Sequence, residues 1–121
     1  MAKKILIVDD AVFMRMMLKG ILEPYGYEIV GEAEDGDKAV ELFKQLKPDL
    51  VTMDIIMTNM GGIESLREIK RIDNNAKVVV ISAVDQRQAL LETIRLGAKD
   101  FIVKPFEEER VLSVVKKALE K

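Results

Sequence analysis

Five short apolar runs of strand length alternate along the chain with five longer segments of helical period, and this alternation fixes the fold class. The runs at 5–8, 50–53 and 78–81 are apolar almost without interruption. Such runs are typical of parallel strands that are covered by helices on both faces. The pattern therefore predicts an α/β fold with a doubly wound, five-stranded parallel sheet.

The predicted elements fit a single domain over residues 1–121, since a chain of this length can bury one real core. The mixed composition of residues 28–33 fits an edge strand, and Pro24 is expected to end the first helix. The strands are expected near residues 4–8, 27–33, 49–53, 77–82 and 100–103, and the helices near 12–24, 36–47, 62–72, 85–97 and 107–120.

The composition excludes several classes of function. The chain has no Cys and no His, which rules out disulfides, Cys-containing zinc sites and catalysis by Cys–His or Ser–His–Asp groups. A net charge of −2 with both signs interspersed gives no basic surface for nucleic acid. There is no apolar run long enough for a transmembrane helix and no secretory signal, so a cytoplasmic protein is expected.

Acidic side chains and one lysine stand directly after three of the apolar runs. Asp9 and Asp10 follow the first run, Asp54 follows the third, and Lys104 follows the fifth. Since the carboxyl ends of parallel strands meet at one edge of the sheet, we expect these four side chains to lie close together. Three carboxylates there need a balancing charge beyond that of Lys104. Because only oxygen ligands are available, the pattern favours Mg²⁺, with Mn²⁺ or Ca²⁺ as alternatives.

This cluster indicates metal-assisted phosphoryl chemistry. The carboxylate of Asp54 can serve as a nucleophile that forms an aspartyl phosphate, while a metal and Lys104 neutralise the phosphoryl oxygens. The hydroxyl of Ser82, at the end of the fourth strand, could donate to the same group. Local structural roles are the alternatives: the Asp9-Asp10 pair could cap the first helix, and Ser82 could cap the fourth. The methionines at 14, 16 and 17 are expected in the core.

In this order, the set resembles the receiver domain of two-component response regulators, and within that family the single-domain chemotaxis regulators. The resemblance covers nearly the whole chain. It is the resemblance, and not the residue pattern, that supplies the flavodoxin-like strand order 2-1-3-4-5 with five helices. The matching segments are residues 5–10, 49–54, 80–83 and 99–106, and residues 13–15 after the acid pair are similar to the chemotaxis branch.

The resemblance implies a role for each residue at the strand ends. Asp54 would accept a phosphoryl group from the phosphohistidine of a histidine kinase. Asp10, Asp54 and the backbone carbonyl of Ile56 would hold Mg²⁺, with Asp9 acting through a water molecule. Two further residues, Ser82 and Lys104, would contact the phosphoryl oxygens.

The resemblance also implies how the phosphorylated state is recognised. Ser82 and Phe101 are the expected switch residues, and the Phe101 ring would rotate inward on phosphorylation. The changed surface would comprise the fourth helix, the fifth strand and the fifth helix. Its expected partner is a flagellar switch protein or motility adaptor. A chemotaxis-type histidine kinase and a phosphatase are the other expected partners, with no nucleic acid, no membrane and a monomeric state.

The sequence departs from the family just after Asp54. Where the family usually has Met-Pro followed by Met, Asp or Asn, and Gly, this chain reads Met-Thr-Asn-Met-Gly-Gly over residues 57–62. Losing the proline and gaining Gly61 should loosen the loop and weaken the cap of the third helix. Weaker Mg²⁺ binding or a displaced loop is therefore expected, and Thr58→Pro with Gly61→Asn should tighten binding. The apolar Ile56 and Val84 beside the phosphoryl group should slow self-dephosphorylation.

Three alternative functions share parts of this pattern. A haloacid-dehalogenase-type phosphatase would need an Asp-x-Asp nucleophile motif after the first strand, where this chain has Asp9-Asp10-Ala11. A flavodoxin-like electron carrier would need hydroxyls and glycine there, and not two carboxylates facing a phosphate. A receiver of another phosphorelay, or a fragment of a DNA-binding regulator, remains an alternative. Because the sequence ends directly after the last helix, a stand-alone signalling switch that turns over no external substrate is expected.

Overall fold

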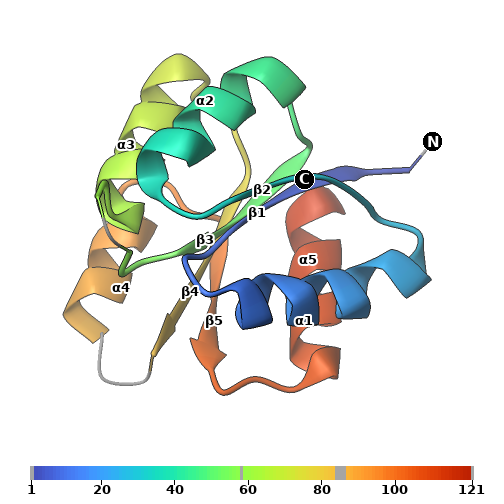
Figure 1. The fold of residues 1–121 in the computed structure, drawn as a ribbon. Helices are drawn as coiled ribbons and strands as arrows, with labels where there is room; N and C mark the ends of the chain where they lie inside the picture. The colour runs from blue at the N-terminus through green and yellow to red at the C-terminus, as the bar shows by residue number, and fades with distance from the viewer. Residues whose placement is uncertain (1, 58, 84–86, 121) are drawn as a thin grey trace.

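Five parallel strands form one sheet with helices on both faces (Figure 1). The structure is a computed structural model that describes residues 2–57, 59–83 and 87–120. The strand order is β2-β1-β3-β4-β5, so the predicted fold class and strand order are confirmed. The elements in chain order are β1 (Lys4–Val8), α1 (Val12–Leu22), the 3₁₀ helix η1 (Glu23–Tyr25), β2 (Glu28–Ala33), α2 (Gly36–Leu46), β3 (Leu50–Asp54), α3 (Gly62–Ile72), β4 (Val78–Ala83), α4 (Arg87–Arg95), β5 (Asp100–Lys104) and α5 (Glu108–Glu120).

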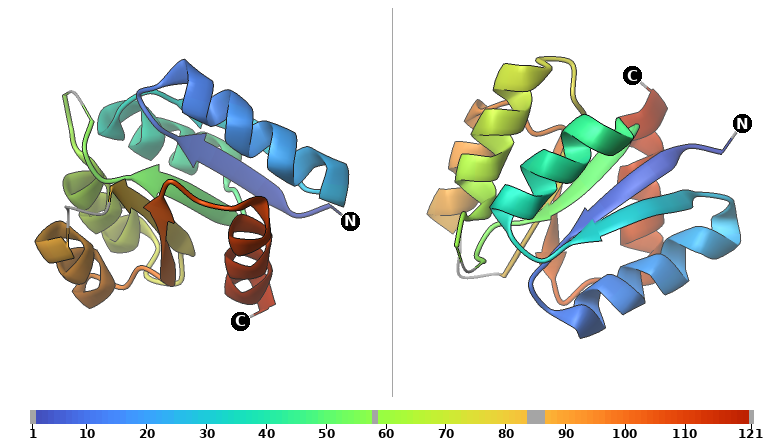
Figure 2. Two further views of the ribbon diagram at one scale, coloured as in Figure 1. Left: turned by 90° about the horizontal axis from the view of Figure 1, so that it is seen from below. Right: turned by 45° about the horizontal axis from the view of Figure 1, so that its top comes forward.

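The burial of each strand follows its place in the sheet. β3 lies in the middle of the sheet and is buried at all five positions, and β4 is buried at all but its last. β2 pairs with β1 alone, and its residues are mostly half-exposed or exposed (Figure 2). The prediction that residues 28–33 form an edge strand is therefore confirmed.

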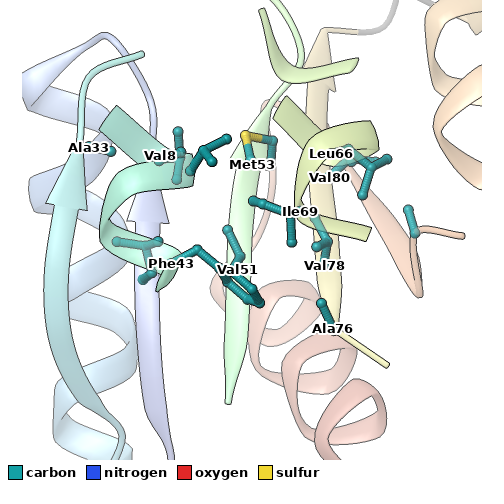
Figure 3. Packing of buried hydrophobic residues seen from close by; sticks show 14 of the residues in the cluster. Val8, Ala33, Phe43, Val51, Met53, Leu66, Ile69, Ala76, Val78 and Val80 are labelled. Carbon is teal, nitrogen blue, oxygen red and sulfur yellow. The ribbon is translucent and has the colours of Figure 1, made fainter. Parts of the chain in front are cut away.

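The sheet separates two apolar cores. Alternate residues of β1 point to opposite faces, so Leu6 and Val8 belong to one core, and Ile5 and Ile7 to the other. The first core lies beneath α2 and α3, where Phe43, Leu66 and Ile69 pack against the middle strands (Figure 3). The second lies beneath α1 and α5 on the other face (Figure 1). Both faces of the central strands are thus covered, which holds their carboxyl ends in place.

Proline and glycine set the chain reversals as expected. α1 ends at Leu22, and Pro24 lies in the 3₁₀ turn that follows it. Gly26 and Gly97 have φ angles of 91° and 105°, in the left-handed region that glycine adopts without steric cost. The Lys104–Pro105 peptide bond is cis. The two glycines allow the chain to turn after η1 and after α4.

The methionines of α1 are not all in the core, contrary to the prediction. Met14 packs at the margin of the second core, but Met16 is 65% exposed and Met17 is 36% exposed. Helical geometry explains the difference, because Leu18 and Ile21 occupy the face that turns toward the sheet.

Among the helices of the described residues, none combines the length and the apolar character that a membrane crossing requires.

Candidate functional site

The carboxyl ends of β1, β3 and β5 bring the three predicted acids and the lysine together. Asp9 and Asp10 follow β1 directly, while Asp54 and Lys104 are the last residues of β3 and β5. Lys104 Nζ lies 3.3 Å from Asp9 Oδ2 and 3.5 Å from Asp54 Oδ1. The lysine therefore bridges two carboxylates from the neighbouring strands β1 and β3, although β4 lies between β3 and the lysine's own strand, β5.

The three aspartates form a compact oxygen cluster. One carboxylate oxygen from each of Asp9, Asp10 and Asp54 lies within 4.8 Å of the others. Asp9 and Asp54 are buried, with exposed fractions of 1% and 6%, whereas Asp10 is exposed. Asp9 and Asp54 are thus shielded from water, whereas Asp10 faces the solvent. An ion can therefore approach the cluster from the side of Asp10.

Burial of Asp54 has an electrostatic cost. Desolvation and then the negative charge of Asp9 raise the pKa of Asp54 from 3.8 to about 6, and the positive charge of Lys104 opposes this rise. The single lysine does not fully offset the repulsion among the acids. A cluster in this state binds an additional cation favourably, because the cation stabilises the ionised form of Asp54.

The donor set fits a hard divalent cation. Carboxylate oxygens are the ligands that Mg²⁺ prefers, and one or two of them suffice when water and phosphate complete the shell. Asp9 Oδ1 already accepts a hydrogen bond from the backbone N–H of Ala11 at 2.9 Å. Asp9 Oδ2 accepts from Lys104 Nζ at 3.3 Å, so both oxygens of Asp9 already have a partner within the protein.

The helix-capping alternatives are wrong for these residues. The N-cap of α1 is Ala11, and no side chain caps this helix. Ser82 lies inside β4, and its Oγ is one of two buried side-chain atoms in the described part of the chain without a hydrogen-bond partner. A buried hydroxyl without a partner is costly unless a ligand completes it. Ser82 thus has an unpaired hydroxyl near the carboxyl end of β4, the strand that pairs with β3.

Ser82 and Phe101 line the same cavity. This cavity of about 530 Å³ lies between β4, β5 and α4, and Leu90 and Ile94 form part of its helical wall. Phe101 is half-buried, and the Arg110 guanidinium lies 5.7 Å from the ring centroid. The ring thus lines the cavity and also packs against the first core. The two predicted switch residues therefore share one open space.

The loop after Asp54 shows the weaker helix cap that its glycines predict. Gly61 is the N-cap of α3 and provides no side-chain hydrogen bond. A Cβ atom on Gly62 would lie 2.1 Å from the carbonyl oxygen of Asp54, so only glycine fits beside the acid. Ile56 is 58% exposed. The predictions on Thr58 and Val84 concern positions outside the described residues.

Arg15 is a site residue that the sequence pattern did not reveal. Its Nη1 donates to the carbonyl oxygen of Asp9 at 2.5 Å, and its Nε donates to Glu32 Oε1 at 3.0 Å. The guanidinium thus ties α1 and β2 to the backbone that carries the acid pair. The available signal was that Arg15 lies six residues after Asp9, within the predicted first helix. That spacing does not identify the Glu32 contact.

Comparison with known proteins gives one consistent result. Residues 5–116 match the response regulator receiver domain. The chain is 56% identical over 117 residues to the chemotaxis protein CheY of Thermotoga maritima, covering 97% of this chain and 98% of that protein. It is 56% identical over 119 residues to CheY of Bacillus subtilis, covering 98% and 99%. It also resembles a chain in the crystal structure of the CheX-CheY-BeF3-Mg²⁺ complex from Borrelia burgdorferi, with a TM-score of 0.93 and 40% identity. The match covers 98% of this chain and 90% of the chain in that structure.

Proposed function

Because this chain belongs to the response regulator receiver family, we propose that it is a chemotaxis-type signalling switch phosphorylated on Asp54. The observation that carries the proposal is the buried Asp54 carboxylate, which has Lys104 Nζ 3.5 Å away and two further acids within 4.8 Å. The relatives named above, which match it over nearly their whole length, are chemotaxis proteins. This supports the chemotaxis branch over a receiver from another phosphorelay.

In the proposed reaction, an oxygen of Asp54 attacks the phosphorus of a phosphohistidine on the kinase. The new P–O bond gives an acyl phosphate, and the P–N bond breaks with its electron pair passing to the imidazole nitrogen, which takes up a proton. Lys104 neutralises phosphoryl oxygens, and the Ser82 hydroxyl donates a hydrogen bond to one of them. Later attack of water on the phosphorus breaks the bond to Asp54, releases inorganic phosphate and regenerates the carboxylate. In this proposal the chain acts only on its own phosphoryl group.

The proposed metal is Mg²⁺, or Mn²⁺ in its place, held by Asp10, Asp54 and the Ile56 backbone carbonyl, with Asp9 acting through water. When bound, the ion neutralises charge on the transferred phosphoryl group. Asp54 must be ionised both to bind the ion and to attack. Its raised pKa of about 6 therefore favours metal binding and phosphorylation above that pH.

The proposed output surface is formed by α4, β5 and α5. Ser82 would draw toward the phosphoryl group and the Phe101 ring would fill the cavity that both residues line. Leu91 and Ile94 on α4 are 50% and 41% exposed, which gives this surface apolar contacts for a partner. A flagellar switch protein or motility adaptor is the proposed partner, and the changed Phe101 position would alter its affinity.

A chemotaxis-type histidine kinase and a phosphatase complete the proposed set of partners. The Borrelia relative is described in a complex with CheX, BeF3 and Mg²⁺, which supports both a regulatory partner and the metal for this chain. A cytoplasmic, monomeric protein without nucleic-acid or membrane contacts is proposed, in line with the mixed surface charge and net charge of −2.

Intact-protein mass spectrometry after incubation with acetyl phosphate tests the proposal. With Mg²⁺, one phosphoryl group should be added to the wild-type protein and to Glu41→Gln, a surface control, but not to Asp54→Ala. EDTA should abolish the addition. Phosphorylation of Asp54→Ala to the same extent, or no adduct on the wild-type protein at any Mg²⁺ concentration, would refute the proposed function.

A further inference from the structure

The start of α2 is packed against the loop that joins β3 to α3. The buried Gly36 donates its N–H to the carbonyl oxygen of Met60 at 2.8 Å, and a Cβ at position 36 would lie 2.5 Å from that same oxygen. Ser65 Oγ, also buried, donates to the carbonyl oxygen of Gly36 at 3.1 Å. There is no space between helix and loop, so the position of one restrains the other.

A side-chain hydrogen bond extends this contact toward the metal-binding end of the loop. Asn59 Nδ2 donates to Asp35 Oδ2 at 2.9 Å, while Asp35 Oδ1 accepts from the Lys38 N–H at 2.9 Å and caps α2. One carboxylate therefore serves both the helix and the loop. The Lys38 N–H and then the Asn59 amide hold the pKa of Asp35 below its ordinary value, so the bond to Asn59 is charge-assisted at neutral pH.

Asn59 also has the backbone conformation that this contact needs. Its φ of 62° lies in the left-handed region, which asparagine tolerates better than most residues. Ile55 and Met57 are anchored in the first core, but Ile56 is 58% exposed between them. Gly61 provides no side-chain hydrogen bond at the start of α3. The Asn59 side chain instead connects this part of the loop to the start of α2 through Asp35.

We propose that the Asp35–Asn59 hydrogen bond is a positioning contact that sets the affinity of the site for Mg²⁺. Neither residue touches the ion; the bond limits the movement of the loop that carries the Ile56 carbonyl. It takes over part of the restraint that a proline in this loop would give. The inference rests on the proposed function, since it uses the metal site assigned there.

Three variants separate the hydrogen bond from the charge and the helix cap. Asp35→Ser keeps a good capping oxygen but has no second oxygen for Asn59. Asp35→Asn removes the same charge, caps equally well, and can still pair with Asn59 when that amide turns over. Asn59→Gly removes the amide and retains the left-handed backbone. Asp35→Asn is thus the matched control for Asp35→Ser.

The dissociation constant of Mg²⁺ alone should be measured by calorimetry or NMR, with urea unfolding in EDTA run in parallel. Asp35→Ser and Asn59→Gly should weaken binding about threefold, as expected for one hydrogen bond, with Asp35→Asn near the wild-type value. Equal affinity in all four proteins would overturn the proposal, as would equal weakening in both Asp35 variants. Wild-type protein that binds no Mg²⁺ would overturn the proposed function itself, and this inference with it.

Discussion

Replacing Asp54 by asparagine should stabilise the metal-free protein at neutral pH. The carboxylate is buried beside Asp9, and its pKa is raised from 3.8 to about 6. At about 1.4 kcal/mol per pH unit, keeping this group ionised costs the folded state ~3 kcal/mol at neutral pH. Asparagine has nearly the same shape and no charge. The free energy of unfolding should therefore rise by ~2–3 kcal/mol in Asp54→Asn.

The gain should depend on pH in a defined direction. Below pH 3.8 the carboxyl is protonated in both the folded and the unfolded state, so Asp54→Asn gains nothing. As the pH rises from 3.8 to about 6, only the folded state keeps the proton, and the wild-type protein loses stability relative to the variant. Above about pH 6 the full difference is present and stays constant.

Urea unfolding in EDTA at a series of pH values measures this difference. Glu41→Gln is the matched control, because it also removes one negative charge but on an exposed side chain. Its stability should differ little from that of the wild-type protein at any pH. Saturating Mg²⁺ should then reduce the difference in the free energy of unfolding between the wild-type protein and Asp54→Asn, because the ion stabilises the folded wild-type protein. Equal stability of these two proteins at neutral pH, or a gain that persists at low pH, would refute the electrostatic reasoning.

Three further predictions concern other parts of the site. Gly62→Ala places a Cβ 2.1 Å from the Asp54 carbonyl oxygen and should cost at least ~2 kcal/mol in urea unfolding; Gly20→Ala, which has open space, should instead be neutral or stabilising. Lys104→Met should raise the pKa of Asp54 above 6 in an NMR titration and slow phosphorylation by acetyl phosphate, because the lysine lowers that pKa; an unchanged pKa would contradict this. Ile56→Asn combined with Val84→Glu should shorten the phosphoryl lifetime, and an unchanged lifetime in a decay assay would disprove the shielding role.

The sequence pattern predicted the sheet because its signals are local and repeated. Each strand is marked by its own apolar run, and the order of residues along the chain puts Asp9, Asp54 and Lys104 at strand ends without any knowledge of long-range contacts. The strand order came from the resemblance, since periodicity does not say which strands are neighbours. The boundaries differ from the predicted ones by at most two residues, as at Asp54, which closes β3 one residue later than predicted.

Other features could not be predicted because they depend on contacts across the fold. The Arg15 contact with Glu32 joins α1 to β2, and the Asp35–Asn59 bond joins residues 24 positions apart. The exposure of Met16 was missed because apolar content alone does not show which face of α1 turns to the sheet. The Asp35 cap, by contrast, is local, and its Asp-Gly sequence could have indicated it.

The position of β5 at the sheet edge bears on how the chain folds. Asp9 and Lys104 are 95 positions apart, and β1, β2 and β3 can pair before β5 exists. A partly folded chain that ends before β5 would gather three carboxylates with no lysine among them, and would therefore be held back by their repulsion. When β5 joins the sheet, Lys104 brings a positive charge next to Asp9. The site thus joins distant parts of the chain, and the closure of so long a loop is expected to be slow.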